Sequence, residues 1–137
     1  MKAIIVAGEH GSRLFPMTRF THKTLLPLNG KPIIDYALQT ITNAGITDIT
    51  IIGNKFIDKI RQHVGEKANY VLEEEPRGVA AALQLAREGN QNCNLLIWFS
   101  DNITNIDIRT EVNSFTSGAI FLTREVENPS EFGIAVE

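Results

Sequence analysis

The chain has 137 residues, a formal net charge of −3 and one cysteine, Cys93. This length suits a single domain that buries roughly two thirds of its unfolded surface. The negative charge argues against a general nucleic-acid binder, which needs a surplus of Lys and Arg. One cysteine excludes an intrachain disulfide, and no apolar run approaches signal-peptide or transmembrane length. We therefore expect one cytoplasmic domain, residues 1–137, with neither a membrane nor a nucleic-acid polymer as partner.

The segment from Met1 to Pro27 organises the rest of the chain. It begins with a short apolar run, residues 3–7, that predicts a buried strand. A loop with Gly8 and Gly11 follows, and glycines let backbone amides approach phosphate oxygens. The cations Arg13 and Lys23 come next, which together suggests a polyphosphate site. A plain strand-to-loop turn with two solvated basic side chains fits these residues equally well.

Strands and helices are expected to alternate along the chain. Apolar runs rich in β-branched residues indicate strands, and helical spacing of apolar residues with glycine stops indicates helices. The run at 95–99 is apolar throughout, the pattern of a central parallel strand. The expected strands cover residues 3–7, 25–28, 48–52, 69–72, 95–99, 119–123 and 133–136, and the expected helices cover residues 33–44, 56–64, 79–88 and 106–114.

This alternation predicts a doubly wound α/β fold with a mostly parallel sheet covered on both faces. In such folds, ligands bind beyond the carboxyl ends of the strands. Residues suited to ligand binding or catalysis directly follow three of the expected strands: Gly8 to Arg13, Glu73 to Gly78, and Asp101. We therefore expect them to share one site at one edge of the sheet.

Several blocks in this order resemble the sugar-1-phosphate nucleotidylyltransferases, and the glucose-1-phosphate thymidylyltransferases most of all. The resemblance covers essentially the whole chain and implies a three-layer α/β/α Rossmann-like fold that lacks the C-terminal part of the family fold. The matching blocks are Gly8, Gly11, Ser12, Arg13 and Leu14; Lys23-Thr24-Leu25-Leu26-Pro27; Glu74-Glu75-Pro76-Arg77-Gly78; and Asp101-Asn102.

The resemblance implies transfer of a nucleotidyl group, from dTTP or UTP, to a sugar 1-phosphate with release of pyrophosphate. Such phosphoryl chemistry needs positioning and charge neutralisation more than a covalent nucleophile. Arg13 would hold the pyrophosphate, Lys23 would bridge the reacting phosphates, and Asp101 would bind Mg²⁺, the implied cofactor. The resemblance assigns nucleotide binding to Ala7, Gly8, Gly11, Ser12, Arg13, Glu73, Pro76 and Gly78.

Three residues depart from the family pattern. Glu9 stands where a second glycine is usual, and its carboxylate would repel a triphosphate if it pointed inward. Ser100 replaces the glycine before the metal-binding Asp101. Glu73 stands where the family reads thymine with Gln. A carboxylate only accepts hydrogen bonds, so Glu73 suits the two donors of guanine better, or else must be protonated or displaced. For Glu74, a solvated acidic turn is the simpler interpretation.

The segment Glu131-Phe132-Gly133 resembles a sugar-contacting turn, which makes Gly133 a candidate sugar-binding residue. Family members are considerably longer, so this chain carries the nucleotide half of the site. The alternative function is a nucleotide-binding or regulatory module without turnover. A glycosyltransferase is a third possibility, and it would not need Lys23. Uncovered sheet edge and apolar surface also lead us to expect self-association.

The remaining polar and aromatic residues receive no catalytic role. His10, His22 and His63 are not spaced as metal ligands, and we expect His22 to be a solvated loop residue. Trp98 and Phe99 are expected in the core.

Overall fold

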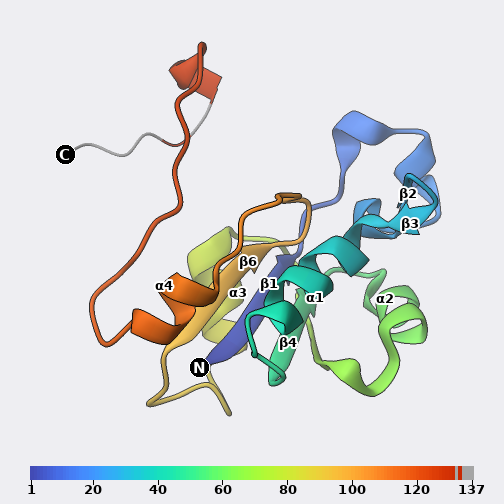
Figure 1. The fold of residues 1–137 in the computed structure, drawn as a ribbon. Coiled ribbons are helices and arrows are strands. Elements are labelled where there is room, and N and C mark those ends of the chain that lie inside the picture. Colours follow the sequence, from blue (N-terminus) through green and yellow to red (C-terminus); the bar gives the residue numbers. More distant parts are fainter. Residues whose placement is uncertain (132, 134–137) are drawn as a thin grey trace.

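The computed structural model describes residues 1–131 and 133, and the sheet at its centre is parallel (Figure 1). Within these residues, four strands lie in the order β5-β4-β1-β6, and each neighbouring pair is parallel. The order reverses between β1 and β6, which creates the position where doubly wound sheets bind ligands. The strands are β1 (Lys2–Ala7), β4 (Ile49–Gly53), β5 (Asn69–Leu72) and β6 (Leu95–Phe99), and a separate antiparallel hairpin pairs β2 (Pro27–Leu28) with β3 (Lys31–Pro32).

Helices cover both faces of the sheet, which gives three layers. Figure 1 shows α1 and α4 in front of the sheet and α3 behind it. The helices are α1 (Ile33–Asn43), α2 (Ile57–Val64), α3 (Val79–Leu85) and α4 (Arg109–Ser114), and 3-10 turns lie at Ser12–Leu14, Met17–Arg19, Lys23–Leu25, Gly65–Lys67 and Pro129–Glu131. None of the helices described is long and apolar enough to cross a membrane.

Alternation along the strands produces two cores, because successive side chains of a strand point to opposite faces. In β1, Ala3 and Ile5 face α1 and α2, whereas Ile4 faces α3. The larger core also contains Ile51 of β4 and Trp98 of β6. The smaller core packs Ala82 and Ala86 against the opposite face. The predicted Rossmann-like architecture is therefore confirmed, as is the assignment of Trp98 to the core.

The prediction of a central strand at 95–99 is wrong for the described sheet. There β6 pairs with β1 alone and forms an edge, and Ile97 and Phe99 are each 42% exposed. Phe99 is therefore not the core residue expected. An apolar run indicates that both faces of a strand favour burial, but it carries no information on whether a second strand pairs alongside.

The C-terminal elements also differ from expectation. Residues 119–123 form no strand, and Phe121 is 81% exposed in a segment that runs away from the sheet (Figure 1). Strand propensity there has no neighbouring ladder to stabilise it. Helix α3 ends at Leu85 rather than residue 88, because the Asn90 side chain donates to the carbonyl of Ala86 at 2.7 Å and a turn follows. The expected strand at 133–136 lies outside the described residues, apart from Gly133.

Two buried polar side chains hold the loop that follows β1. Asn54, directly after β4, donates to the carbonyls of Gly8 and Glu9 at 3.2 and 3.1 Å. His22 lies 3.1 Å from the same Glu9 carbonyl through Nε2, and the Thr24 amide donates to its Nδ1. Only 1% of each side chain is exposed, so the expectation of a solvated His22 is wrong. Its contacts to residues distant in sequence decide its burial.

We expect Ile51→Ala to lower the free energy of unfolding by about 2–5 kcal/mol, because it empties a fully buried position in the larger core. Chemical denaturation measures the change. The matched control is Ile103→Ala at a position that is 43% exposed, which should cost less than about 1 kcal/mol. Equal losses at both positions would contradict the assignment of the core.

Stability should also depend on His22 in mild acid. Burial, only partly offset by the hydrogen bond to Glu9, lowers the pKa of His22 to about 4, whereas in the unfolded chain it is about 6.5. Between these values the unfolded chain binds a proton that the folded chain does not, so acidification favours unfolding.

We expect the wild type to lose about 1–2 kcal/mol more unfolding free energy than His22→Gln between pH 7 and pH 5. Denaturant titrations at both pH values measure this difference, and the glutamine keeps a side-chain donor without a titratable group. Parallel pH profiles for the two proteins would refute the assignment.

Candidate active site

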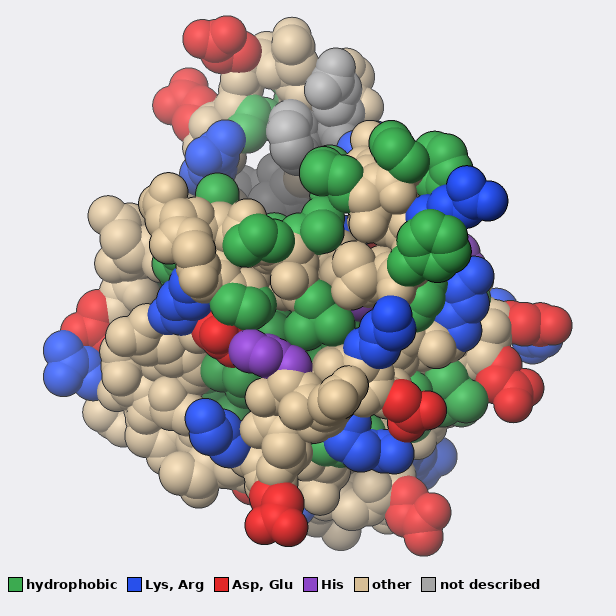
Figure 2. All heavy atoms as spheres, turned by 90° about the vertical axis from the view of Figure 1, so that its right-hand side faces the viewer, with side chains coloured by type: hydrophobic (Ala, Val, Ile, Leu, Met, Phe, Trp, Pro, Cys, Tyr) green, Lys and Arg blue, Asp and Glu red, His purple; other side chains and the backbone are tan. Residues whose placement is uncertain are grey.

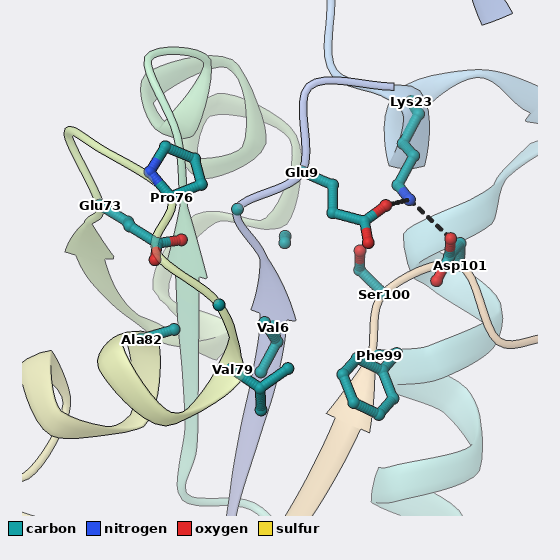
Figure 3. Close-up of a pocket in the computed structure, with 13 residues that line it drawn as sticks. Val6, Glu9, Lys23, Glu73, Pro76, Val79, Ala82, Phe99, Ser100 and Asp101 are labelled. Carbon is teal, nitrogen blue, oxygen red and sulfur yellow. Dashed lines mark hydrogen bonds and ion pairs between the residues drawn. The ribbon is translucent and has the colours of Figure 1, made fainter. Parts of the chain in front are cut away.

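A pocket opens at the carboxyl ends of β1 and β6, where the strand order reverses (Figure 3). Its volume is about 90 Å³, well below the roughly 300 Å³ of a complete small-molecule site. It therefore accommodates part of a ligand, and the remainder would lie on the open surface beside it. Of the residues selected from the sequence, the pocket is lined by Ala7, Gly8, Lys23, Glu73, Pro76, Gly78 and Asp101.

A buried lysine bridges two carboxylates at one end of this pocket (Figure 3). The Nζ atom of Lys23 lies 2.7 Å from Glu9 Oε2 and 2.6 Å from Asp101 Oδ2. Lys23 begins a 3-10 turn and is 8% exposed. We refer to these three side chains as the ion cluster. It joins the loop after β1, the turn at Lys23–Leu25 and the end of β6.

The ion cluster keeps Lys23 charged. Burial alone would lower the pKa of Lys23, but the hydrogen bonds to Asp101 and Glu9 outweigh burial and raise the pKa above its ordinary value. A buried ammonium without such partners would be strongly destabilising. The pocket therefore contains a charged ammonium, but both of its carboxylate partners are negative, so a phosphate must replace at least one of them to bind Lys23 directly.

The sequence alone did not decide whether the Glu9 carboxylate points toward the site or toward solvent. In the structure, Glu9 directs its carboxylate toward the site, because the carboxylate bonds to Lys23 and lines the pocket (Figure 3). Its side chain is nevertheless 74% exposed, so it can turn toward solvent with little loss of burial. Glu9 thus occupies a donor of Lys23 that a phosphate would otherwise use.

The opposite end of the pocket is built around Glu73, directly after β5. Its side chain passes so close to Gly8 that a Cβ added there would lie 1.9 Å from Glu73 Oε2. A side chain at position 8 would therefore displace the Glu73 carboxylate from its place in the pocket. Glu73 is 3% exposed and points into the pocket (Figure 3), whereas Glu74 is exposed, as expected for a solvated turn.

The remainder of the glycine loop lies outside the pocket lining. Gly11 has a φ of +64°, and a Cβ added there would approach Thr18 Cγ2 at 3.1 Å, so both backbone conformation and space favour glycine. Ser12 and Arg13 lie on the 3-10 turn that follows and are exposed. Their roles toward a nucleotide stay predictions.

The donor set at Asp101 fits the implied Mg²⁺. This cation is usually held by one or two carboxylates together with substrate phosphates and water, and Asp101 presents a carboxylate that is 48% exposed at the rim of the pocket. Residues 1–131 and 133 contain no group of three or more His, Cys, Asp or Glu side chains placed to hold a metal. Mg²⁺ binding by Asp101 stays a prediction.

Gly133 is described but does not line the pocket, and it is exposed. The 3-10 turn Pro129–Glu131 that precedes it lies at the far end of the segment running away from the sheet (Figure 1). Its sugar-binding role stays a prediction, and Phe132 lies outside the described residues.

Sequence reasoning missed Asn54 and His22, the side chains that hold the loop after β1. A signal for Asn54 was present, because it directly follows β4 at the same edge of the sheet as the other site residues. For His22 there was none, since an isolated histidine in a loop is usually solvated.

The surface beside the site combines apolar and basic side chains. Figure 2 views the face formed by the segment from Gly11 to Pro32 and by α2, and hydrophobic side chains there lie among Lys and Arg. Phe15, Met17 and Phe20 are each at least 60% exposed.

The chain is similar in sequence to named nucleotidyltransferases. It is 34% identical to a low-salt glycan biosynthesis nucleotidyltransferase of Haloferax volcanii over 98% of this chain and 41% of that protein. It is 31% identical to a glucose-1-phosphate thymidylyltransferase of Streptomyces griseus, with the same coverage, and 34% identical to one of Mycobacterium tuberculosis over 50% of that protein. The chain thus spans half or less of the length of these relatives.

Solved structures are similar to it in fold. A protein from Bacillus anthracis assigned as a glucose-1-phosphate thymidylyltransferase, in complex with sucrose, superposes with a TM-score of 0.79 at 35% identity, over 82% of this chain and 49% of that one. A UDP-glucose pyrophosphorylase in complex with UDP-glucose gives a TM-score of 0.70 at 17% identity, over 82% of this chain and 52% of that one, which shows a shared fold. The family model described as nucleotidyl transferase matches residues 2–137, and the chain therefore belongs to the nucleotidyl transferase family.

Proposed function

We propose that this chain transfers a nucleotidyl group from a nucleoside triphosphate to a sugar 1-phosphate. A phosphate oxygen of the sugar phosphate attacks the α-phosphorus, the bond from that phosphorus to the bridging oxygen breaks, and pyrophosphate leaves. The observation that carries this proposal is the charged, buried Lys23 at the switch point of the sheet. Two negatively charged phosphates must approach each other, and a fixed cation between them stabilises that arrangement.

Each site residue has a distinct task in this scheme. The amides of the loop from Gly8 to Ser12 would bind phosphate oxygens, and Arg13 would hold the leaving pyrophosphate. Asp101 would bind Mg²⁺, whose charge would be shared with phosphate oxygens. Lys23 would exchange its contacts to Glu9 and Asp101 for contacts to the reacting phosphates.

The names of the relatives suggest dTTP as the donor and glucose 1-phosphate as the acceptor, and UTP is the alternative donor expected from the sequence. These identities belong to the relatives and are substrates to test here. Self-association and a cytoplasmic location likewise stay predictions.

A second candidate is a nucleotide-binding module without turnover. Glu9 favours it, because its carboxylate pairs with the lysine that catalysis needs. Pyrophosphate release with Mg²⁺ decides between the two, measured with each nucleoside triphosphate and dTTP against a panel of sugar 1-phosphates. Release that requires both substrates supports the enzyme, whereas nucleotide binding without release for any pair supports the module.

Lys23→Ala should lower the rate of pyrophosphate release by about 10²–10³-fold, because it removes the fixed cation at the site. The matched control is Lys67→Ala on the exposed turn after α2, which should retain the wild-type rate. Pyrophosphate release that survived Lys23→Ala would contradict the role proposed for Lys23. Sugar transfer from a nucleotide sugar by this variant, without pyrophosphate release from any triphosphate, would favour a glycosyltransferase.

Glu9→Gln should strengthen triphosphate binding in the absence of the sugar phosphate. The change removes a negative charge beside Lys23 but keeps a side chain of the same shape, so we expect a gain on the order of fivefold that decreases with salt, since Glu9 is largely solvated. Isothermal titration calorimetry with each triphosphate measures it, with the exposed Glu66→Gln as control. Weaker binding to Glu9→Gln would show that the carboxylate supports the ligand.

A further inference from the structure

Glu73 is a largely buried residue whose carboxylate opens into the pocket. Only 3% of the residue is exposed, yet it lines the pocket and its side chain points inward (Figure 3). The amide of Glu73 donates to the Gly53 carbonyl at 2.8 Å and fixes the backbone. Neither carboxylate oxygen accepts a hydrogen bond from another residue in the part of the chain described. The carboxylate lies against Gly8, on the side where a Cβ would stand.

The carboxylate of Glu73 reaches solvent through the pocket, since the one buried side-chain oxygen without a partner among the described residues is Glu111 Oε2. A ligand that filled the pocket would displace this water, and burying the carboxylate without replacing the lost hydrogen bonds is destabilising. An ionised carboxylate can only accept hydrogen bonds. A ligand that brings N–H groups to this end of the pocket would therefore relieve the cost of burial. A ligand that brought carbonyl oxygens there would be repelled.

The two ends of the pocket define the polarity of its ligand. Lys23 lies at one end and Glu73 at the other, and the apolar side chains of Val79 and Ala82 lie on the Glu73 side (Figure 3). An anionic group fits the lysine, and a flat group with hydrogen-bond donors fits the carboxylate. Since the proposed function places phosphates at Lys23, the base of the nucleotide lies toward Glu73.

Among the bases, guanine alone presents two adjacent donors, N1–H and the N2 amino group, which match the two oxygens of a carboxylate in parallel hydrogen bonds. Thymine and uracil present one N–H between two carbonyl oxygens. Adenine and cytosine present an amino group beside an accepting ring nitrogen. We propose that Glu73 selects a guanine nucleotide at this site. This inference rests on the proposed function and departs from the pyrimidine that the names of the relatives suggest.

Binding of GTP, ITP, dTTP and UTP to the whole chain, measured by titration calorimetry with Mg²⁺, tests the proposal. We expect GTP to bind at least about tenfold more tightly than dTTP or UTP, since a site built for donors rejects ligands that lack them. ITP, which keeps N1–H but lacks the N2 amino group, should bind more weakly than GTP by about fivefold or more.

The variant Glu73→Gln supplies a matched test, because an amide both donates and accepts. It should weaken GTP binding by at least about tenfold and strengthen dTTP and UTP binding. The control Glu74→Gln alters the exposed neighbour and should leave all four affinities unchanged. Should Glu73→Gln fail to fold, as judged by circular dichroism, the contrast between GTP and ITP in the wild type still decides.

Equal affinities for GTP and ITP, tighter binding of dTTP or UTP by the wild type, or no nucleotide binding would each overturn the inference. The inference and the proposed function fail separately. Tight, Glu73-dependent GTP binding without pyrophosphate release would leave the inference standing and remove the transferase. Release from dTTP by a chain indifferent to GTP would do the reverse.

Discussion

The ion pairs of Lys23 with Glu9 and Asp101 are the interaction on which the site depends. A buried ammonium is tolerated only where carboxylates compensate for lost hydration, so three loops must meet at one point. These loops follow β1, precede the β2–β3 hairpin and follow β6. Their meeting point coincides with the reversal of strand order, where the two halves of a doubly wound sheet leave a crevice. The ion pairs with Glu9 and Asp101 therefore both keep Lys23 charged and hold it at this point of the sheet.

Behind the ion cluster, neutral polar side chains hold the backbone of the loop after β1. Asn54 and His22 both reach the carbonyl of Glu9, and both are buried. Because these contacts engage carbonyl oxygens, the amides of the loop stay available to an anionic ligand. The Glu9 side chain, in contrast, is largely solvated. The loop thus combines a fixed backbone with a mobile carboxylate. If the Glu9 side chain turned toward solvent, a negative charge would leave Lys23 while the backbone of the loop kept its conformation.

The two ends of the pocket differ in chemistry and are formed by different parts of the chain. The loops at the ends of β1 and β6 supply the carboxylates of Glu9 and Asp101 that pair with Lys23, whereas the segment from β5 to α3 supplies Glu73 and the apolar side chains of Val79 and Ala82. The chain spans half or less of the length of the curated relatives it matches. In the described sheet β6 is an edge strand, and Ile97 and Phe99 on it are exposed. The described residues therefore form a small pocket, of about 90 Å³, with the Lys23 ion pairs at one end, the Glu73 carboxylate at the other and an exposed strand edge beside it.

By itself, the sequence determined the order of the elements and the edge at which the site lies. Local periodicity defines each strand and helix, and parallel topology brings Gly8, Glu73 and Asp101 to one edge. Only the tertiary structure decided that Glu9 points inward, that His22 and Glu73 are buried, that β6 is an edge strand, and that residues 119–123 form no strand. Each of these depends on partners distant in the chain: Asp101 lies 78 residues from Lys23, and Asn54 lies 45 residues from Glu9. Local propensity contains no information about such contacts, because burial and pairing are set by whatever the fold places alongside.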